Sequence, residues 1–454
     1  MATKNKSIDM LNGPILPNIL KYTLPIFLTS VLQLLFNATD LVVVGQFCGS
    51  LSVSAVGVTG SITNLIINLF LGLSVGSGVA VAHAVGCNNK DAVTKTVHTA
   101  LPTALVSGVF LTVFGVLFSK TFLRLMGTPE NVLELASVYM QIYFCGITFS
   151  MVYNFCASIL RAVGDTKSPL IFLSIGGVIN VTLNIILVTL FDMNVAGVAL
   201  ATIIAQAFSA VMVVITLCKR TDDCKLVLKD IRFHKDELLR IIRIGLPAGI
   251  QGALFSISNV LIQSSVNSFG EDFIAGNSAA ANLESFVYVL LAAFQQAAVN
   301  FIGQNTGARK FKRIKKIFWT CTVSVSVSGF VLGSVFYLFG RQLLSIYITD
   351  SALAIEYGLL RMAFICLPYF ICGLVEVTTG ALRGLGSSLA PMVISILGIC
   401  GIRLLWIYTI FGIEKFHTPE CLFLSYIISW IITFGLQLAA FLVLYKRLSC
   451  YSND

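Results

Sequence analysis

Long apolar stretches separated by short charged segments run along the whole chain. The longest interval without a charged residue is Leu41–Asn89, enough for most of one membrane-spanning helix, a turn and a second helix, since a helix needs about 20 apolar residues to cross a bilayer. The stretches are too long and too uniformly apolar for the alternating strands of a membrane β-barrel. The pattern therefore predicts an all-α membrane protein with twelve transmembrane helices. Their expected ranges are 17–45, 52–85, 92–119, 131–160, 167–190, 195–218, 237–268, 274–303, 311–340, 352–382, 388–412 and 420–446.

The composition supports a lipid environment and excludes several classes of protein. Hydrophobic residues make up 57% of the chain and charged residues 11%, against about 25% charged in a soluble domain. The 12 Cys are scattered without a C-x-x-C pair, so neither a zinc site nor a disulfide framework is expected. Nucleotide-binding and hydrolase motifs are absent from the sequence, so we expect no enzyme activity and no cofactor.

The basic residues predict the orientation in the membrane. The connections that follow even-numbered spans, together with the two termini, hold 24 of the 30 Lys and Arg. By the positive-inside rule both termini face the cytoplasm, which makes the chain a multi-pass protein of the cytoplasmic membrane. The basic segments Lys219–Arg243 and Arg309–Lys316 are typical of loops beside anionic lipid headgroups, so nucleic acid is not expected as a partner. The opposite side holds only Lys120, Arg124, Arg341 and Lys415.

An internal repeat relates the two halves of the chain. A shift of 222 residues aligns Leu24-Pro25 with Leu246-Pro247, and Leu160-Arg161 with Leu382-Arg383. Each half has six spans, an even number, so both halves enter the membrane in the same orientation and are related by a pseudo-twofold axis along its normal. We expect an N-terminal lobe over 1–218, a cytoplasmic linker over 219–236 and a C-terminal lobe over 237–454.

Three carboxylates lie well inside the predicted spans, and Asp40 is the one with the most polar surroundings. Ionisable groups in transmembrane helices are costly and mark proton, ion or substrate paths. Burial disfavours the charged form of a carboxylate, so we expect Asp40 to bind and release a coupling ion, a proton or Na⁺. Asn180, Asn184 and Asn154 are the expected partners in cation coupling, with Na⁺ possible at Asp40, Asn180 and Asn184. Gln33 and Asn37, on the same helix face as Asp40, and Asn68 are expected to bind substrate.

The other two carboxylates, Glu284 and Glu376, belong to the C-terminal half. Tyr288 lies one turn after Glu284, and Tyr369 lies two turns before Glu376. Carboxylates flanked by aromatic rings attract lipophilic cations, so all four side chains are predicted to bind substrate. A structural ion pair with Arg361 or Arg403, which lie within spans ten and eleven, is the alternative.

The order of these motifs resembles the multidrug and toxic compound extrusion (MATE) family. The resemblance covers nearly the whole chain and implies two pseudo-symmetric six-helix bundles of the MATE/MOP type, which export cationic amphipathic drugs in exchange for H⁺ or Na⁺. It also implies that Asp40 occupies the position of the coupling Asp of many bacterial members. The motifs that carry it are Leu24-Pro25, Asp40-Leu-Val-Val-Val-Gly45, Leu160-Arg-Ala-Val-Gly-Asp-Thr-Lys-Ser-Pro169 with Asn180 and Asn184, Gly303-Gln-Asn-Thr-Gly-Ala308 and Leu382-Arg-Gly-Leu-Gly386.

The chain departs from one branch of that family. The positions at which members with C-lobe acids on spans seven and ten carry Glu and Asp hold Phe255 and Cys372 here, which favours coupling through Asp40. The resemblance leaves two other readings open. One is a flippase for lipid-linked oligosaccharides of the same superfamily, which would prefer a cationic cavity. The other is an unrelated membrane channel or enzyme. As partners we expect small cationic substrates and membrane lipid, and we expect a monomer.

Overall fold

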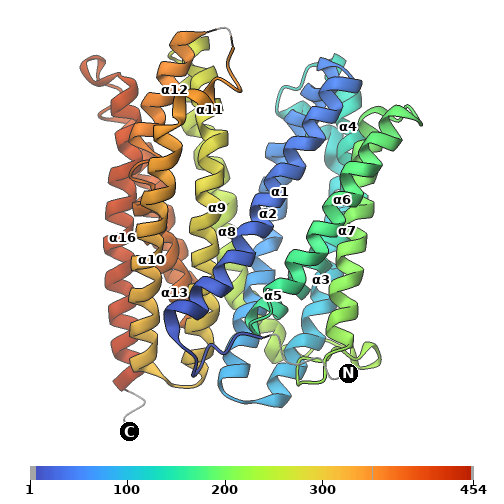
Figure 1. Cartoon of the computed structure of the whole chain (residues 1–454), viewed down its shortest axis with the longest axis vertical. Coiled ribbons are helices and arrows are strands. Elements are labelled where there is room, and N and C mark those ends of the chain that lie inside the picture. Colours follow the sequence, from blue (N-terminus) through green and yellow to red (C-terminus); the bar gives the residue numbers. More distant parts are fainter. Residues whose placement is uncertain (1–6, 350, 451–454) are drawn as a thin grey trace. The chain divides into compact units, whose positions relative to one another are not determined.

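The computed structural model describes residues 7–349 and 351–450, which fold into helices without a strand (Figure 1). A π-helical turn, Ile396–Gly401, joins α14 to α15, and short 3₁₀ turns cover Leu228–Asp230 and Glu414–Phe416. The α-helices are α1 (Ile15–Phe47), α2 (Ser50–Gly86), α3 (Lys90–Leu125), α4 (Glu130–Cys145), α5 (Ile147–Ala162), α6 (Lys167–Thr189), α7 (Asn194–Cys218), α8 (Lys235–Asn267), α9 (Glu271–Gly307), α10 (Phe311–Leu338), α11 (Gly340–Leu344), α12 (Ala352–Phe364), α13 (Tyr369–Gly384), α14 (Leu389–Ser395), α15 (Ile402–Tyr408) and α16 (Pro419–Cys450).

The predicted all-α membrane architecture is confirmed. By length and composition, ten helices in the described part of the chain can cross a membrane, and twelve when each of two bent pairs counts as one span. The helix expected over 131–160 breaks into α4 with α5, at 45°, and the helix expected over 352–382 breaks into α12 with α13, at 48°. Gly146 separates the first pair, where a Cβ would lie 2.3 Å from Ile203. Pro368, which has no N–H to donate, begins the second half of the other pair.

Contacts divide the chain into two compact units. Of the described residues, 7–9 and 28–253 form the first, which we name the N unit, and 10–27, 254–349 and 351–450 form the second, the C unit. This division differs from the lobes expected from chain order, because the first part of α1 belongs to the C unit and the first part of α8 belongs to the N unit.

Local contacts explain both exchanges. In the C unit, Asn305 donates a hydrogen bond to the carbonyl of Met10 at 3.0 Å, so the segment before α1 is fixed to the end of α9. In the N unit, the backbone N–H of Val227 donates to His98 of α3 at 3.0 Å, and that of His234 donates to Thr99 at 3.1 Å. The segment that precedes each half's first span is therefore anchored through its own backbone groups, a carbonyl that accepts in the C unit and N–H groups that donate in the N unit.

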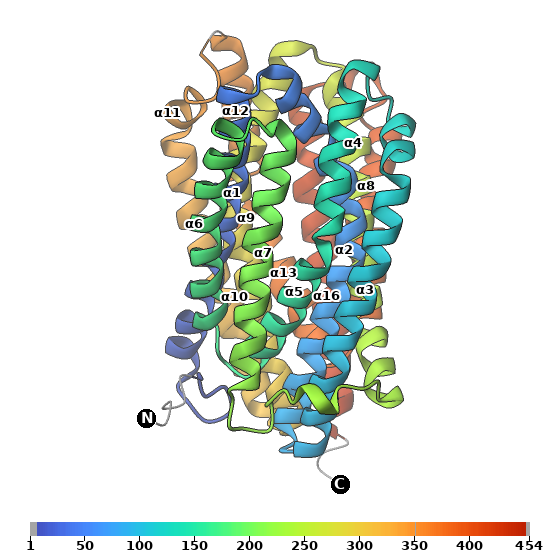
Figure 2. The ribbon, with the colours of Figure 1, turned by 90° about the vertical axis from the view of Figure 1, so that its right-hand side faces the viewer.

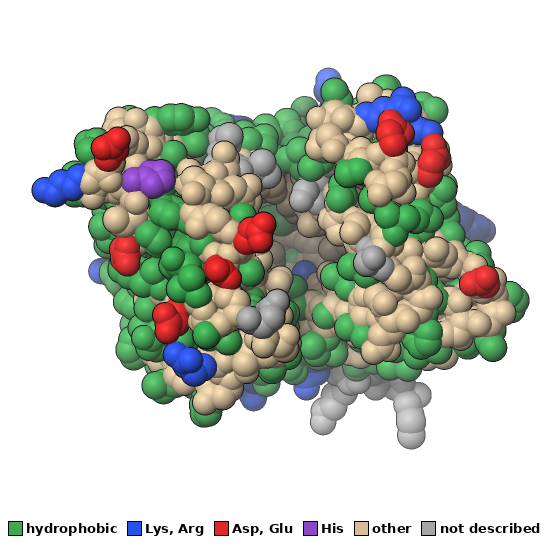
Figure 3. Space-filling view, turned by 90° about the horizontal axis from the view of Figure 1, so that it is seen from above, with side chains coloured by type: hydrophobic (Ala, Val, Ile, Leu, Met, Phe, Trp, Pro, Cys, Tyr) green, Lys and Arg blue, Asp and Glu red, His purple; other side chains and the backbone are tan. Residues whose placement is uncertain are grey.

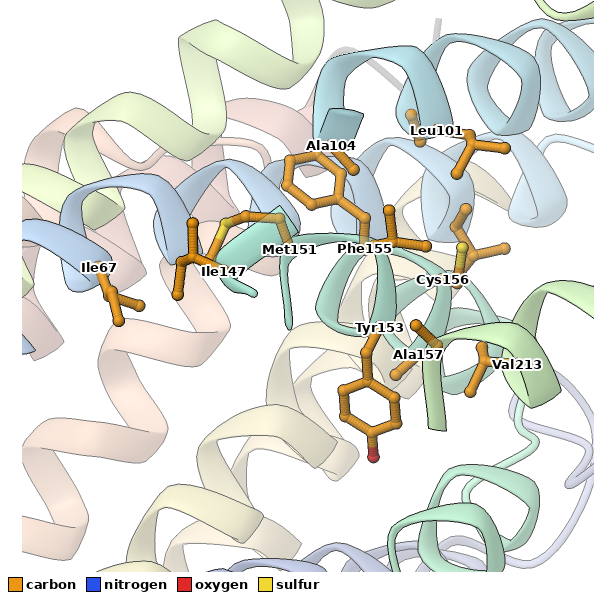
Figure 4. Close-up of a cluster of buried hydrophobic side chains, with 14 of the residues drawn as sticks. Ile67, Leu101, Ala104, Ile147, Met151, Tyr153, Phe155, Cys156, Ala157 and Val213 are labelled. Carbon is orange, nitrogen blue, oxygen red and sulfur yellow. The ribbon is translucent and has the colours of Figure 1, made fainter. Parts of the chain in front are cut away.

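The N unit is held together by a continuous apolar core between α2, α3, α4, α5 and α7. Phe155 and Met151 of α5 lie fully buried at its centre, with Ala104 of α3 and Val213 of α7 beside them (Figure 4). Alongside this core, α6 and α7 run next to each other, as Figure 2 shows. Helices packed in this way bury apolar side chains tightly and give the polar side chains among them fixed positions.

Glycines bring α2 against the first part of α8 within the N unit. A Cβ on Gly72 would lie 2.2 Å from the backbone nitrogen of Gly249, and one on Gly76 would lie 2.3 Å from the carbonyl oxygen of Ile241. Such small residues let helix backbones approach closely in membrane proteins. The glycines at positions 72 and 76 therefore pack α2 against α8.

In the C unit, α9 packs against α10, α12 and α13, and α16 packs against α13. Aromatic rings fill much of the space between these helices; Phe318 of α10 and Phe441 of α16 stack with their ring centres 4.2 Å apart. The π-helical turn before α15 precedes Arg403 by two residues. Such turns are rare and frequently occur at functional sites.

Candidate functional site

The polar cluster around Asp40 lies within the N unit. Asp40 of α1 is 8% exposed and accepts a hydrogen bond from the amide of Asn184 on α6. Asn184 also donates to Asn180 Oδ1 at 3.3 Å, and Asn180 donates to Thr202 Oγ1 of α7 at 3.2 Å. Three helices thus contribute to one connected network, as expected for polar groups inside lipid, which must satisfy one another.

Local sequence explains why these side chains meet. Asn180 and Asn184 are four residues apart, so they lie on one face of α6. Gly177 lies on α6 at the point where the ring of Phe36 approaches; a Cβ on Gly177 would lie 1.7 Å from that ring. The absence of a side chain at Gly177 lets α1 approach α6, which brings Asp40 within hydrogen-bonding distance of Asn184.

One acceptor of the cluster has no donor. Asn184 Oδ1 is buried and receives no hydrogen bond in the described part of the chain. A buried acceptor without a donor is unfavourable, and both a proton on the neighbouring carboxyl and a bound cation would satisfy it. The described residues contain no group of three His, Cys, Asp or Glu that could hold a metal ion, so any Na⁺ here would rely on Asp40 and amide or hydroxyl oxygens.

Sequence reasoning missed three neighbours of Asp40. Thr202 extends the hydrogen-bond network, and Tyr139 and Tyr143 of α4 lie close enough to interact electrostatically with Asp40. The spacing of four between the two tyrosines is the available signal, since it places two phenol groups on one helix face.

The structure does not bring every predicted residue into this network. Asn154 bonds only within its own helix, to Ser150. Gln33 and Asn37 are exposed and lie on α1 two turns and one turn before Asp40, respectively. Asn68 is half-buried beside Gly252 of α8. None of the hydrogen bonds described for Asp40 involves these four side chains.

In the C unit, Glu376 of α13 is buried and accepts hydrogen bonds from two side chains of α9. Gln295 donates its amide N–H, and Tyr288 donates its hydroxyl at 3.3 Å. Tyr288 is 38% exposed, and its ring centre lies 6.4 Å from that of Tyr369. The structure thus brings Glu376, Tyr288 and Tyr369 together, and Tyr369 also interacts with Glu284, the fourth residue predicted to bind substrate in this half.

The fourth, Glu284, forms an ion pair. Its Oε2 atom lies 2.7 Å from Nη2 and 3.2 Å from Nε of Arg361, whose Nη1 donates to Asn277 at 2.6 Å. Glu284 was predicted either to bind substrate or to form a structural ion pair, and the structure contains the ion pair, with Arg361. Both charged groups are buried away from water, so each is stabilised by the opposite charge of the other.

A known protein family matches each half of the duplicated chain. The MatE family model matches the chain twice, over residues 25–186 and 247–409. The chain belongs to the MatE family. The two matches begin 222 residues apart, at 25 and 247, so the repeat deduced from the sequence is the repeat of this family.

Relatives and solved structures agree with this assignment. The chain is 29% identical over 390 residues to the probable multidrug resistance protein YoeA of Bacillus subtilis, with 84% of each chain covered. It is 26% identical to the probable multidrug resistance protein NorM of Thermotoga maritima, covering 85% of this chain and 83% of the relative. An outward-facing multidrug resistance MATE transporter of the MOP superfamily has the same fold, with a TM-score of 0.90, 20% identity and 100% of both chains covered.

Proposed function

We propose that this MatE protein is a secondary active multidrug efflux antiporter, which exports cationic amphipathic compounds in exchange for protons by alternating access. The observation that carries the proposal is the buried carboxylate of Asp40, bonded to the amide of Asn184 and linked through it to Asn180. The names of the relatives, which are multidrug resistance or multidrug export proteins, support the export of drugs.

In the proposed cycle, a proton and a cationic substrate compete for one negative charge. With Asp40 ionised, the carboxylate accepts the amide N–H of Asn184 and attracts a cation. A proton that enters from outside removes this charge and turns one carboxyl oxygen into a donor, for which Asn184 Oδ1 is an available acceptor. The hydrogen bonds of the cluster then rearrange, the substrate is released, and loss of the proton to the cytoplasm restores the first state.

The energy available is sufficient for this exchange. One charge that crosses a potential of about 100 mV supplies roughly 2.3 kcal/mol. Export of a monovalent cation against a hundredfold concentration ratio requires about 2.8 kcal/mol, and moving its charge against the same potential requires about 2.3 kcal/mol more. With one proton per substrate the two charges cancel and the pH difference alone drives export, whereas with two protons the potential contributes as well.

Polar and aromatic groups of the C unit are further proposed substrate contacts. Glu376 and the partly exposed Tyr288 offer a carboxylate and an aromatic ring to a cation. Tyr369 extends the aromatic surface beside Tyr288. Gln33, Asn37 and Asn68 are the corresponding proposed contacts in the N unit.

We also propose a monomer in the cytoplasmic membrane with both termini inside the cell. The positive-inside rule assigns the end rich in Lys and Arg to the cytoplasm. Few basic side chains are visible on the face in Figure 3, which is the proposed outer face.

The substitution Asp40→Asn tests the proposal, because it keeps the shape of the side chain and removes its charge. We expect uptake of ethidium into inverted vesicles, the direction that corresponds to export from the cell, to fall to the background rate under an imposed pH gradient that is acid inside, with the protein still inserted. Asp192→Asn, at an exposed loop residue, is the matched control and should transport normally. Undiminished proton-driven transport by Asp40→Asn would reject the assignment. Transport by the unchanged protein under a Na⁺ gradient alone would show that Na⁺, and not the proton, is the coupling ion.

A further inference from the structure

Arg403 is a buried guanidinium that pairs with no carboxylate in the described part of the chain. It lies in α15, directly after the π-helical turn, and is 5% exposed. Its Nε donates a hydrogen bond to Ser429 Oγ of α16 at 3.0 Å. Among the described residues this is its only hydrogen bond, so both Nη groups have donors to spare.

The surroundings of Arg403 are neutral. The guanidinium carbon lies 4.0 Å from the ring centre of Tyr426 and 5.7 Å from that of Trp430. The ionisable side chains close enough to interact with it electrostatically are the phenols and thiols of Tyr426, Cys372, Cys400 and Tyr369.

The other buried charges of the C unit are differently placed. Arg361 has Glu284 at 2.7 Å, and Glu376 interacts electrostatically with Arg383. Arg403 therefore stands apart as a positive charge whose neighbours supply π electrons and one hydroxyl group. Buried charges of this kind in a membrane protein mark ligand or ion paths more often than they stabilise the fold.

A row of aromatic rings connects Arg403 to the exposed part of the C unit. The ring centres of Trp430 and Tyr369 lie 5.4 Å apart, and those of Tyr369 and Tyr288 lie 6.4 Å apart. Tyr288, at the exposed end, donates its hydroxyl to Glu376. The row thus has a carboxylate at one end, a guanidinium at the other and aromatic surface between them.

We propose that Arg403, with Tyr426 and Trp430, binds the acidic group of an aromatic substrate. A guanidinium recognises a planar carboxylate through two parallel N–H donors, and Arg403 has its Nη donors available. The ligand class is an aromatic zwitterion whose ammonium group lies toward Glu376 and whose carboxylate lies at Arg403. The site thus adds compounds with a carboxylate to the cations of the proposed function. The export of such ligands rests on the proposed function, but their binding to Arg403 does not.

The test uses rhodamine B, a zwitterion with a free carboxylate, and its ethyl ester, which is a cation of nearly the same shape. Binding of each dye to the purified protein in detergent is measured by fluorescence anisotropy. For Arg403→Met we expect the affinity for rhodamine B to fall about tenfold or more, because a charge-assisted hydrogen-bonded pair is lost. The affinity for the ester should change less than about twofold.

Two further variants separate binding from folding. Arg403→Lys keeps the charge without the planar fork and should recover part of the affinity for rhodamine B, with the ester unchanged. Arg341→Met, at an exposed residue of α11 in the same unit, should bind both dyes as the unchanged protein does. Equal loss of both dyes in Arg403→Met, or no loss of either, would overturn the proposal and assign Arg403 a structural role. Because the assay contains no ion gradient, its result does not depend on proton coupling at Asp40.

Discussion

At the scale of single residues, the three acids buried in the spans differ in what compensates them. Asp40 accepts an amide N–H from Asn184, and Glu376 accepts from an amide and a phenol. Glu284 is paired with the guanidinium of Arg361. A carboxylate with neutral donors around it is available to a cation, whereas an adjacent guanidinium already supplies the counter-charge. These contacts support the proposed ion exchange at Asp40 and a structural ion pair at Glu284.

The ion pair gives a stability prediction. Glu284→Gln leaves Arg361 buried without its counter-charge, so we expect the free energy of unfolding to fall by about 3–5 kcal/mol, measured by denaturant unfolding in detergent. Glu356→Gln, at an exposed residue of the same helix as Arg361, is the control and should change it by less than about 0.5 kcal/mol. Equal stability of the two variants would show that the pair contributes nothing to the fold.

The sequence was sufficient to predict part of this chemistry. A spacing of four placed Asn180 and Asn184 together, and burial identified Asp40, because both follow from one helix at a time. Thr202, Asn277 and Tyr426 were not predicted as partners. Their positions depend on how neighbouring helices are rotated and shifted along one another, which the pattern of one helix does not contain.

At the scale of helices, glycine determines how closely α2 and α8 approach. The backbones meet where Gly72 faces Gly249 and Gly76 faces Gly245. The number of spans was predictable because each requires its own apolar stretch. The break after α4 was not predicted, since Gly146 occurs in a stretch whose hydropathy alone suits an unbroken helix.

The close approach predicts a difference between two glycines of α2. Gly72→Ala places a Cβ 2.2 Å from the Gly249 backbone, so we expect a loss of about 1–3 kcal/mol in the free energy of unfolding from overpacking. Gly60→Ala is the control, because no atom lies within 4 Å of its Cβ and alanine favours the helix. Thermal unfolding of both variants checks this; an unchanged midpoint for Gly72→Ala would mean that the helices separate freely.

At the scale of the whole chain, duplication is the organising feature. The repeat was predictable from aligned Pro, Leu-Arg and Gly residues, and the family model matches both copies. The sequence did not predict that the first part of α1 belongs to the C unit and the first part of α8 to the N unit. Hydropathy identifies a span, but it carries no information about which bundle the span packs against.

The proposed orientation predicts which cysteines a membrane-impermeant thiol reagent reaches. Cys87 and Cys450 are exposed and lie on the side that we assign to the cytoplasm, so neither should react in intact cells, and both should react in inverted vesicles. Thr418→Cys, in the exposed connection before α16, should show the opposite pattern when expressed with the other cysteines replaced. Labelling of Cys87 from outside intact cells would reverse the orientation.

The exchange of a proton for substrate at Asp40 is the central claim, and the movement of protons during transport tests it most directly. Purified protein is reconstituted into vesicles that contain a pH-sensitive dye, and a gradient of ethidium is imposed without a pH or Na⁺ gradient. The account predicts that protons move against the direction of ethidium flux, and that Asp40→Asn shows no proton movement. Ethidium flux without proton movement in the unchanged protein, or the same proton movement in Asp40→Asn, would contradict it.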